Sequence, residues 1–424
     1  MIDITIYTGD EALDTLIAFL AGRNVRRVTT VSDANTHAAL GAAVEAALRS
    51  AGCALTSIVL PGDVIADERT MMQVFTRVDA ASDMLVSVGS GTLTDIVRFA
   101  GHVMRRPFVA MTSAPSMDGY ASGGAPLVVQ GVKHTYQVEP PVAVISHLPT
   151  LCAAPRAMIA AGLGDMLGKY TAAADWRLGV LLWGEPWDEI AATRTRQALD
   201  RCVAHAAELR TAEPGAIAAL IDGLLESGLS MSDAGHSRPA SGMEHHVSHY
   251  WEMKLLAEGR HAVLHGAKVG VATIAAAALW RHVRCMSEAE FRARLGKARL
   301  PDPDAETARL RGAFGEAAEG VIREHGPFLK MSEAQHRELV ERAARSWVRI
   351  QEIAALVPEP AVLRNVLAAT GGPVSVAELG LTDEEGRLGV RFGHYLRNRF
   401  TVAKLAWLLG LLDEPATVAG LWDA

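Results

Sequence analysis

Hydrophobic and polar positions follow two alternating periods along the first 150 residues. Short β-branched runs such as VRRVTTVSD and DMLVSVGS are separated by segments with helical spacing of apolar residues, such as THAALGAAVEAALRS and TLTDIVRFAGHVM. Strands that alternate with helices are typical of a parallel sheet with helices on its faces. The pattern therefore predicts an α/β domain over residues 1–147, with any ligand at the carboxyl ends of the strands.

The pattern changes after HLPTLCAAPRAM, where helical spacing dominates through segments such as VGVATIAAAALWRHV and FTVAKLAWLLGLL. We expect an all-α second domain over residues 148–424. The stretch MTSAPSMDGYASGGAPLVVQGVKHTYQVEPP before it is rich in Gly, Ser and Pro and too irregular for one element. A long loop in a compact protein is usually functional or mobile.

Composition narrows the class of partner. The chain has 424 residues, 50% hydrophobic residues and a formal net charge of −7, so it offers no basic surface for nucleic acid. Its four cysteines form no CxxC pair, which argues against a disulfide framework or a zinc knuckle. The N-terminus lacks the basic start of a signal peptide, and no apolar run reaches the roughly 18 residues that insertion into a membrane needs. We expect a cytoplasmic protein that acts on small metabolites.

A glycine-rich turn follows the run DMLVSV. Gly89, Ser90, Gly91 and Thr92 lie between that strand and a predicted helix that contains Asp95. Glycines let a backbone approach phosphate, and the first N–H groups of a helix favour a pyrophosphate, so the turn fits a Rossmann-like dinucleotide site. An ordinary tight turn is the alternative, because the full GxGxxG pattern is absent. Asp33, at the end of an earlier strand, fits either an adenosine ribose or a helix cap.

A carboxylate and several histidines suggest a metal site. His245 and His249 are four residues apart in EHHVSH, so both project from one face of a helix, whereas His246 points about 100° away. Asp165 in GLGDMLGKY and His265 in LHGAKVG lie in other helical segments. Such ligands can hold a divalent cation with one position open, although each histidine alone could be an ordinary polar residue at a helix end.

The segments VGSGTLTD, TSAPSMDGYAS, GLGDMLGKYTAAADW, SRPASGMEHHVSH and LHGAKVG, in this order, resemble the motifs of glycerol-1-phosphate dehydrogenases. That family lies within the superfamily of iron-containing alcohol dehydrogenases, glycerol dehydrogenase and dehydroquinate synthase. The match runs from about Asp33 to Gly270, and YLRNRFTVAKLAWLLG also fits. The resemblance implies a nucleotide domain whose glycine turn comes late in the sheet, followed by a helical metal domain.

The resemblance also implies roles for individual residues. Asp165, His245 and His265 would be the metal ligands, and Asp118, Asp165 and His249 would contact the substrate and carry the catalysis. The implied contacts with the dinucleotide are Asp33, Gly89, Ser90, Gly91, Thr92, Leu93, Thr94, Asp95, Ser113, Ala114, Pro115, Ser116 and Ser122. The metal would be zinc or nickel, the cofactor NAD or NADP, and the assembly a homodimer.

The implied reaction is the reversible, NAD(P)H-dependent reduction of dihydroxyacetone phosphate to sn-glycerol 1-phosphate. For the phosphate we favour Arg238, with Lys133 and Lys169 as weaker candidates. Lys268 is expected to be a solvated lysine at a helix end, with phosphate binding as the alternative. Three alternatives remain open for the activity: a glycerol dehydrogenase for unphosphorylated polyols, a dehydroquinate synthase-like lyase, and a non-catalytic metabolite-binding protein.

Overall fold

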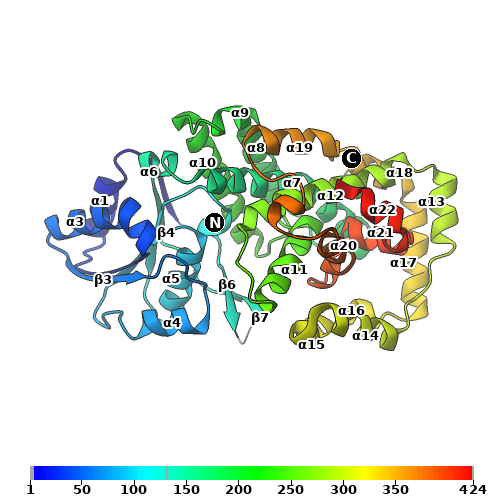
Figure 1. Cartoon of the computed structure of the whole chain (residues 1–424), viewed down its shortest axis with the longest axis horizontal. Coiled ribbons are helices and arrows are strands. Elements are labelled where there is room, and N and C mark those ends of the chain that lie inside the picture. Colours follow the sequence, from blue (N-terminus) through cyan, green and yellow to red (C-terminus); the bar gives the residue numbers. More distant parts are fainter. Residues whose placement is uncertain (1–3, 130–131, 423–424) are drawn as a thin grey trace. The chain divides into compact units, whose positions relative to one another are not determined.

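The computed structural model describes residues 4–129 and 132–422 of the chain (Figure 1). Two compact units are present, each made of two stretches of sequence. The first comprises Met1–Met166 and Asp200–Gly235, and the second comprises Leu167–Leu199 and His236–Ala424. Helix α7 (Arg156–Trp183) continues through the boundary after Met166, so the residues on either side of that boundary share one helix.

A six-stranded sheet in the order β1-β8-β5-β4-β2-β3 forms the centre of the first unit. Every neighbouring pair in it is parallel. Its strands are β1 (Thr5–Gly9), β2 (Arg27–Asp33), β3 (Ala54–Leu60), β4 (Met84–Gly89), β5 (Phe108–Thr112) and β8 (Ala143–His147). Strands β4 and β5 are buried along their whole length, as expected for the middle of a parallel sheet with helices on both faces.

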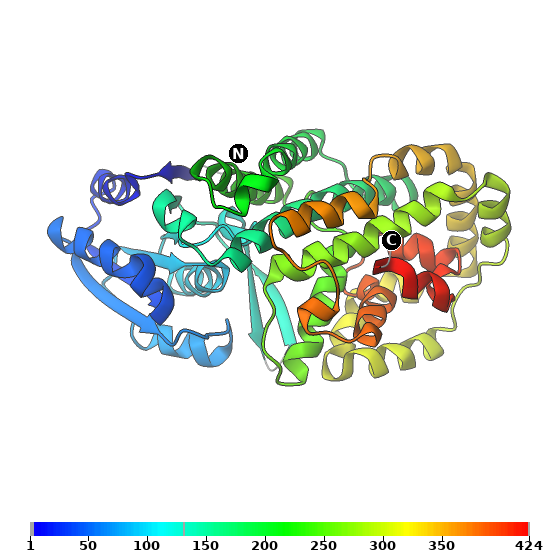
Figure 2. The same cartoon turned by 45° about the horizontal axis from the view of Figure 1, so that its top comes forward.

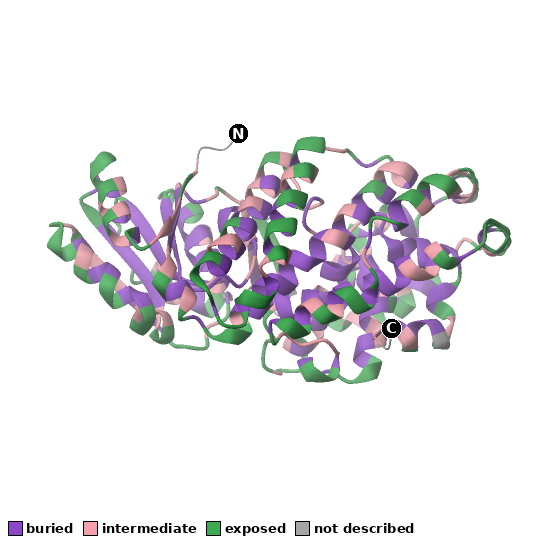
Figure 3. Ribbon diagram, turned by 90° about the horizontal axis from the view of Figure 1, so that it is seen from above, coloured by how far each residue is buried: buried purple, intermediate pink, exposed green. Residues whose placement is uncertain are grey.

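Apolar side chains at alternate strand positions make the main core of this unit. Val28, Val86 and Ile145 pack with residues of α1 (Ala12–Gly22) and α3 (Ala42–Ser50). Figure 3 shows these strands as buried, with exposed residues on the outer sides of the helices. The other helical segments of the unit are α2 (Ala34–Thr36), η1 (His37–Gly41), α4 (Glu68–Phe75), α5 (Gly91–Met104), η2 (Gly119–Ala121), α6 (Leu148–Cys152), α9 (Ala206–Leu209) and α10 (Pro214–Ala234).

Helices joined by loops make up the second unit, and no strand occurs among its described residues (Figure 2). Helix α12 (His265–Cys285) lies at its centre, where every residue from Gly266 to Trp280 is buried. A helix that is apolar on all sides is stable only when it is surrounded, and α12 packs against α11 (Met243–Ala257), α18 (Trp347–Ala354), α19 (Pro360–Ala369) and α21 (Val402–Leu408). Helix α8 (Glu189–Ala204) contains the boundary in the sequence between Leu199 of the second unit and Asp200 of the first.

Shorter helical segments complete the second unit. They are α13 (Glu288–Leu295), α14 (Pro303–Phe314), η3 (Gly315–Ala317), α15 (Ala318–Glu324), α16 (Gly326–Leu329), α17 (Glu333–Arg345), η4 (Ala377–Leu379), α20 (Asp383–Phe392), η5 (Gly393–Tyr395), η6 (Leu411–Asp413), α22 (Pro415–Ala419) and η7 (Gly420–Trp422). Within the described ranges, no helix has both the length and the apolar character that crossing a bilayer requires.

The predicted fold class, a parallel α/β domain followed by helices, is confirmed. The Gly-, Ser- and Pro-rich stretch contains η2 and an antiparallel hairpin of β6 (Gly124–Val129) and β7 (Val132–Gln137). The change from strands to helices comes at Leu148, where α6 begins. The first unit, however, also includes Asp200–Gly235, so the domain boundary expected at Leu148 stays a prediction.

Candidate functional site

Helix α11 carries two of the candidate histidines and begins where the backbone leaves no room for a side chain. A Cβ atom on Gly242, which precedes the helix, would lie 2.7 Å from Oδ2 of Asp175 and 2.9 Å from Cα of Ala172. The glycine in SRPASG therefore lets α11 start against α7. From that start, the rings of His245 and His249 lie on one side of the helix with their centroids 6.3 Å apart.

A third imidazole comes from the first residue of α12. The ring centroid of His265 lies 5.4 Å from that of His245 and 5.5 Å from that of His249. The three rings belong to the second unit and converge although His265 is separated from EHHVSH by a loop. Two helices thus supply the imidazoles, as the spacing in the sequence predicted.

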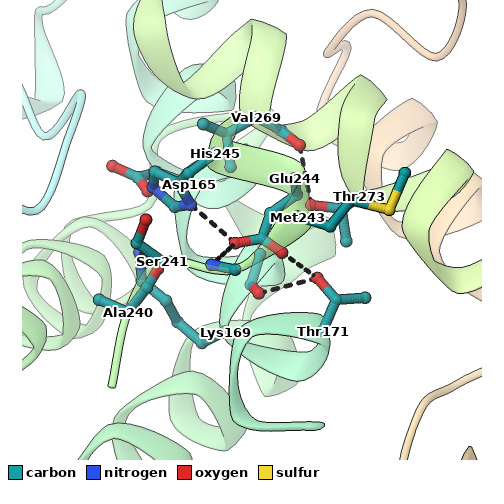
Figure 4. Close-up of polar contacts among 12 residues, drawn as sticks. Asp165, Lys169, Thr171, Ala240, Ser241, Met243, Glu244, His245, Val269 and Thr273 are labelled. Atoms are coloured by element: carbon teal, nitrogen blue, oxygen red, sulfur yellow. Dashed lines mark hydrogen bonds and ion pairs between the residues drawn. The ribbon is translucent and has the colours of Figure 1, made fainter. Parts of the chain in front are cut away.

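Asp165 completes a group that can hold a metal ion. One ligand atom each of Asp165, His245 and His265 lies within 4.8 Å of the other two, and Figure 4 shows the Asp165 carboxylate beside the His245 ring. Asp165 is fully buried and His245 is 5% exposed, so water competes little for these ligand atoms. One carboxylate and two neutral imidazoles suit zinc, nickel or a similar cation. The donor set therefore fits a divalent metal.

Glu244 fixes the orientation of His245. Its Oε1 lies 2.8 Å from Nδ1 of His245, and its two oxygens also accept hydrogen bonds from the Gly242 N–H and the Thr171 hydroxyl (Figure 4). Burial opposes ionisation of this carboxyl, but these bonds outweigh it and lower the pKa of Glu244. A carboxylate that accepts from Nδ1 leaves Nε2 of the same imidazole as the metal-binding atom.

Asp118 lies in the loop after β5 and is joined to Asp165. Its main-chain N–H donates to Oδ2 of Asp165 at 3.0 Å, and its own Oδ2 accepts from the hydroxyl of Ser227 on α10 at 2.9 Å. Two glycines let helices approach this loop, since a Cβ on Gly162 would lie 1.9 Å from the Pro115 carbonyl oxygen. A Cβ on Gly228 would likewise lie 2.6 Å from the Asp118 carbonyl oxygen.

The rest of this loop is also held in place. The residues expected near the nicotinamide, Ser113, Ala114, Pro115 and Ser116, are all buried. Ser122, the other residue of this loop expected to bind the cofactor, donates its hydroxyl to the Gly119 carbonyl oxygen at 3.1 Å. Burial and this hydrogen bond therefore help to hold the loop in place, as suits a binding surface for a rigid ring.

The glycine-rich turn joins β4 to α5 as predicted. Ser90 is the N-cap residue, and Gly91, Thr92, Leu93 and Thr94 form the first turn of the 14-residue helix. A Cβ on Gly89 would lie 2.9 Å from Cβ of Leu93, an atom that side-chain rotation cannot move, so the tight turn favours glycine there. The free N–H groups of this turn lie at the carboxyl end of β4, where a pyrophosphate is expected.

Asp95 has a strong partner inside the protein. The fully buried guanidinium of Arg98 donates to Asp95 Oδ1 at 2.6 Å and to the carbonyl oxygens of Gly119, Tyr120 and Gly124. Asp95 thereby helps Arg98 to hold the loop that follows β5. Contact between Asp95 and the cofactor stays a prediction.

Asp33 caps a helix at the carboxyl end of β2. Its Oδ1 accepts from the Thr36 N–H at 2.8 Å, and the Asp33 N–H donates to the Thr36 hydroxyl oxygen at 3.0 Å, which completes a capping box. This is the cap alternative that its position in the sequence left open. A contact with the adenosine ribose stays a prediction.

Three comparisons with known proteins bear on this geometry. Residues 7–155 match the sequence model of the iron-containing alcohol dehydrogenase family. A protein of Geobacillus stearothermophilus named glycerol-1-phosphate dehydrogenase (NAD(P)+) is 36% identical over 401 residues, which cover 93% of this chain and 90% of that protein. A protein of the same name from Bacillus subtilis is 34% identical over 93% of this chain and 89% of its own length. The chain belongs to the glycerol-1-phosphate dehydrogenase family.

A solved structure supports the fold of this family member. The crystal structure of glycerol dehydrogenase from Schizosaccharomyces pombe superimposes with a TM-score of 0.61, covering 99% of this chain and 90% of that one. Its sequence identity is 14%, so the likeness concerns the fold alone. The family that the sequence motifs predicted is confirmed.

In this glycerol-1-phosphate dehydrogenase family member, His249 and Lys268 share one carboxylate. Oε2 of Glu252 lies 3.6 Å from Nδ1 of His249 and 3.4 Å from Nζ of Lys268. The Lys268 side chain is 1% exposed, so the prediction of a solvated lysine is wrong. Lys268 lies in the first turn of α12, the helix that α11 and its other neighbours enclose, and this packing removes it from water.

Arg238 and Lys169, two of the phosphate candidates, have partners in the second unit. Arg238 donates from Nε to Oε2 of Glu185 at 2.6 Å, and its side chain is 21% exposed. Lys169 is buried and donates to the Ala240 carbonyl oxygen at 3.2 Å. The third candidate, Lys133, lies on β7 in the first unit. His236, two residues before Arg238, packs edge-on against Trp176 with ring centroids 5.6 Å apart.

Sequence reasoning missed Glu185, Glu244, Glu252 and Arg399. Glu252 follows His249 by three residues, a spacing that places both on one helix face and could have indicated the pair. Glu244 is adjacent to His245, but neighbours on a helix point in different directions, so the sequence gives no sign of their hydrogen bond. Glu185 and Arg399 act across more than 50 residues of chain, which no local pattern reveals.

Proposed function

We propose that this protein catalyses the reversible reduction of dihydroxyacetone phosphate to sn-glycerol 1-phosphate with NADH or NADPH and one divalent cation. The observation that carries the proposal is the group formed by Asp165, His245 and His265 in a member of this family. The relatives named glycerol-1-phosphate dehydrogenase (NAD(P)+) supply the substrate and the cofactor class.

The proposed ligands of zinc or nickel are Asp165, His245 and His265. Glu244 holds His245 in the orientation that presents Nε2, and the Asp118 N–H fixes one oxygen of Asp165. When bound, the cation supplies Lewis acidity toward the ketone and the nicotinamide supplies the hydride. The protein residues orient the substrate, exclude water and handle the proton.

The proposed dinucleotide site lies at the carboxyl ends of the strands in the first unit. The first turn of α5, Gly91 to Asp95, with Gly89 and Ser90 before it, takes the pyrophosphate through free N–H groups. Ser113 to Ser116 line the nicotinamide side, Ser122 adds a hydrogen bond, and Asp33 approaches the ribose. The Asp33 carboxylate repels a 2′-phosphate, which favours NAD, although NADP remains an outcome of the assay.

His249, Asp118 and Asp165 are the proposed contacts with the reacting end of the substrate. His249 has Glu252 3.6 Å from its Nδ1, so its Nε2 is the atom that exchanges the proton with the hydroxyl of the product. The Asp118 carboxyl, held by the Ser227 hydroxyl, fixes a hydroxyl group of the substrate. Arg238 is the proposed phosphate contact, through the terminal nitrogens that Glu185 does not use.

We further propose a homodimer in the cytoplasm. The family resemblance supports the dimer. All four cysteines are free and none forms a disulfide in the described chain, as is usual in a reducing compartment.

The deciding experiment starts from protein stripped with EDTA and verified by metal analysis. It is assayed with dihydroxyacetone phosphate and with dihydroxyacetone, each with NADH and NADPH, before and after adding zinc or nickel. We expect activity on the phosphorylated ketone only after metal is restored. Preference for dihydroxyacetone would indicate a glycerol dehydrogenase. Turnover of 3-deoxy-arabino-heptulosonate 7-phosphate without net use of added NADH would indicate a lyase. No turnover of any of these compounds would indicate a binding protein. Full activity without metal would refute the metal proposal.

A further inference from the structure

Hydrogen bonds join two segments of the second unit that are far apart in the sequence, and one of these segments directly precedes α11. Arg399 donates from Nη2 to the Ser237 hydroxyl at 2.8 Å and from Nη1 to the Ser241 carbonyl oxygen at 3.0 Å. Glu185 adds a second link, because its Oε2 accepts from Arg238 and its Oε1 accepts from the Phe400 N–H at 2.8 Å. The loop Ser237–Ser241 and the segment Arg397–Phe400 are therefore held as one structure.

These hydrogen bonds link Arg399 to the segment that precedes the candidate metal ligand His245. Ser241, which receives one bond from Arg399, lies four residues before His245. The charge of Glu244, the residue that orients His245, also acts on the Arg399 guanidinium. Arg399 is thus linked through Ser241 to the segment that leads into α11, although it comes from the opposite end of the unit's sequence.

Arg399 lacks a carboxylate partner. Its hydrogen-bond acceptors are a hydroxyl and a carbonyl oxygen, and among the described residues no carboxylate oxygen lies within 4.0 Å of it. The nearby Glu185 is already engaged on both oxygens. Burial and the neighbouring charges of Arg238 and Arg397 lower the pKa of Arg399 to about 9. Among the described residues, Arg238 therefore has a carboxylate partner here and Arg399 has none within 4.0 Å.

The guanidinium retains donors for a ligand. Of the five N–H groups of an arginine, the two contacts above use two. Arg399 is partly exposed, as is Arg238, whose terminal nitrogens Glu185 does not engage. Two guanidinium groups with unused donors suit the oxygen atoms of a phosphate, which accepts pairs of N–H groups.

We propose that Arg399, together with Arg238, forms the subsite for the phosphate of the substrate. The inference rests on the proposed function and adds a residue to it. Glu185 is a positioning residue, because it anchors both Arg238 and the main chain next to Arg399. The subsite distinguishes a phosphorylated ketone from its unphosphorylated analogue.

The test compares Arg399→Gln and Arg399→Lys with wild-type protein. For Arg399→Gln we expect KM for dihydroxyacetone phosphate to rise about 10- to 100-fold, since a charged hydrogen-bond donor is lost. Any rate that the wild-type protein shows on dihydroxyacetone should stay within about twofold in this variant, because that substrate makes no phosphate contact. Calorimetric titration with inorganic phosphate should show weaker binding by a similar factor. Arg399→Lys keeps the positive charge but loses the planar guanidinium with its paired N–H donors. Its KM and its phosphate affinity should therefore lie between those of the wild-type protein and of Arg399→Gln.

The matched control is Arg391→Gln. Arg391 is a surface arginine of the same unit that pairs with Asp413 at 3.2 Å, and its loss should change none of these constants. Unchanged KM and phosphate affinity in a folded Arg399→Gln variant would overturn the inference. If that variant does not fold, the phosphate affinity of Arg399→Lys decides in its place, and a wild-type value overturns the inference. Wild-type protein that binds phosphate but does not reduce dihydroxyacetone phosphate would instead refute the proposed function.

Discussion

The main-chain N–H of Asp118 donates a hydrogen bond to Oδ2 of Asp165, 3.0 Å away. This bond joins the loop after β5, which carries the residues expected near the nicotinamide, to the one carboxylate of the candidate metal group. Asp165 is fully buried, so its charge depends on such partners for stabilisation. The carboxylate would therefore have two tasks, as the proposed metal ligand and as the acceptor that fixes the loop.

Two substitutions of Asp165 separate these tasks. Asp165→Asn keeps an oxygen that can accept from Asp118 but loses the negative charge, so we expect metal content to fall about tenfold or more with little change in NADH affinity. Asp165→Ala removes both, and NADH should then bind more weakly as well. Metal analysis and fluorescence titration with NADH measure the two effects. Equal behaviour of the two variants would contradict a double role.

His265 and His246 make a matched pair of buried or half-buried imidazoles. We expect His265→Ala to lose bound metal and activity while the first unit still binds NADH, because the lost ligand lies on α12 in the second unit. The ring of His246 is buried, and neither of its nitrogens has a hydrogen-bond partner in the described chain. Replacing it by leucine removes two unsatisfied polar atoms, so His246→Leu should keep its metal and its thermal stability. Loss of metal from His246→Leu would assign it a role at the site.

Glu244 should control metal affinity without being a ligand. Glu244→Gln keeps the shape of the side chain but replaces a charged acceptor of the His245 Nδ1–H by a neutral one. Loss of such a partner typically weakens metal binding about 10- to 100-fold. Competition with a chelator of known affinity measures the change. An unaltered dissociation constant would show that His245 needs no orienting carboxylate.

The sequence predicted the parts of this site that depend on local spacing. His245 and His249 share a helix face because they are four residues apart, and the Gly89 turn follows a strand that is recognisably hydrophobic. Lys268 was misjudged because its burial comes from helices around α12 rather than from its own neighbours in sequence. Arg399 was missed because its partners, Ser237 and Ser241, lie about 160 residues away. Such contacts exist only once the second unit has folded.

The close approach of α10 to the Asp118 loop leads to a prediction that compares two glycines of this helix. Gly228→Ala places a Cβ 2.6 Å from the Asp118 carbonyl oxygen, and a backbone atom cannot move aside cheaply, so unfolding should become easier by about 1–3 kcal/mol. Gly215→Ala is the control, because nothing lies within 4 Å of its Cβ position. That change should be neutral or should stabilise by up to about 1 kcal/mol. Thermal denaturation of both variants tests the contrast, and a similar melting temperature for the two would contradict the packing.

Buried histidines of the second unit should make the protein sensitive to mild acid. His325 and His394 are buried with ring centroids 6.3 Å apart, and their ring nitrogens have no hydrogen-bond partner in the described chain. Burial, together with the charge of Lys404, holds the pKa of each well below its usual value of 6.5. Below pH 6.5 the unfolded chain therefore binds protons that the folded chain does not, and the free energy of unfolding falls as the pH falls.

Each of these histidines contributes a slope of up to about 1.4 kcal/mol per pH unit between pH 6.5 and its folded pKa. Urea denaturation at pH 7.5, 6.5 and 5.5 should show stability nearly constant over the first interval and falling over the second. His325→Leu should lose up to one histidine's share of that slope, because leucine cannot bind a proton. His261→Gln, a change at an exposed histidine, should leave the slope unaltered. An identical slope in wild type and His325→Leu would mean that His325 accepts a proton equally well in the folded and the unfolded chain.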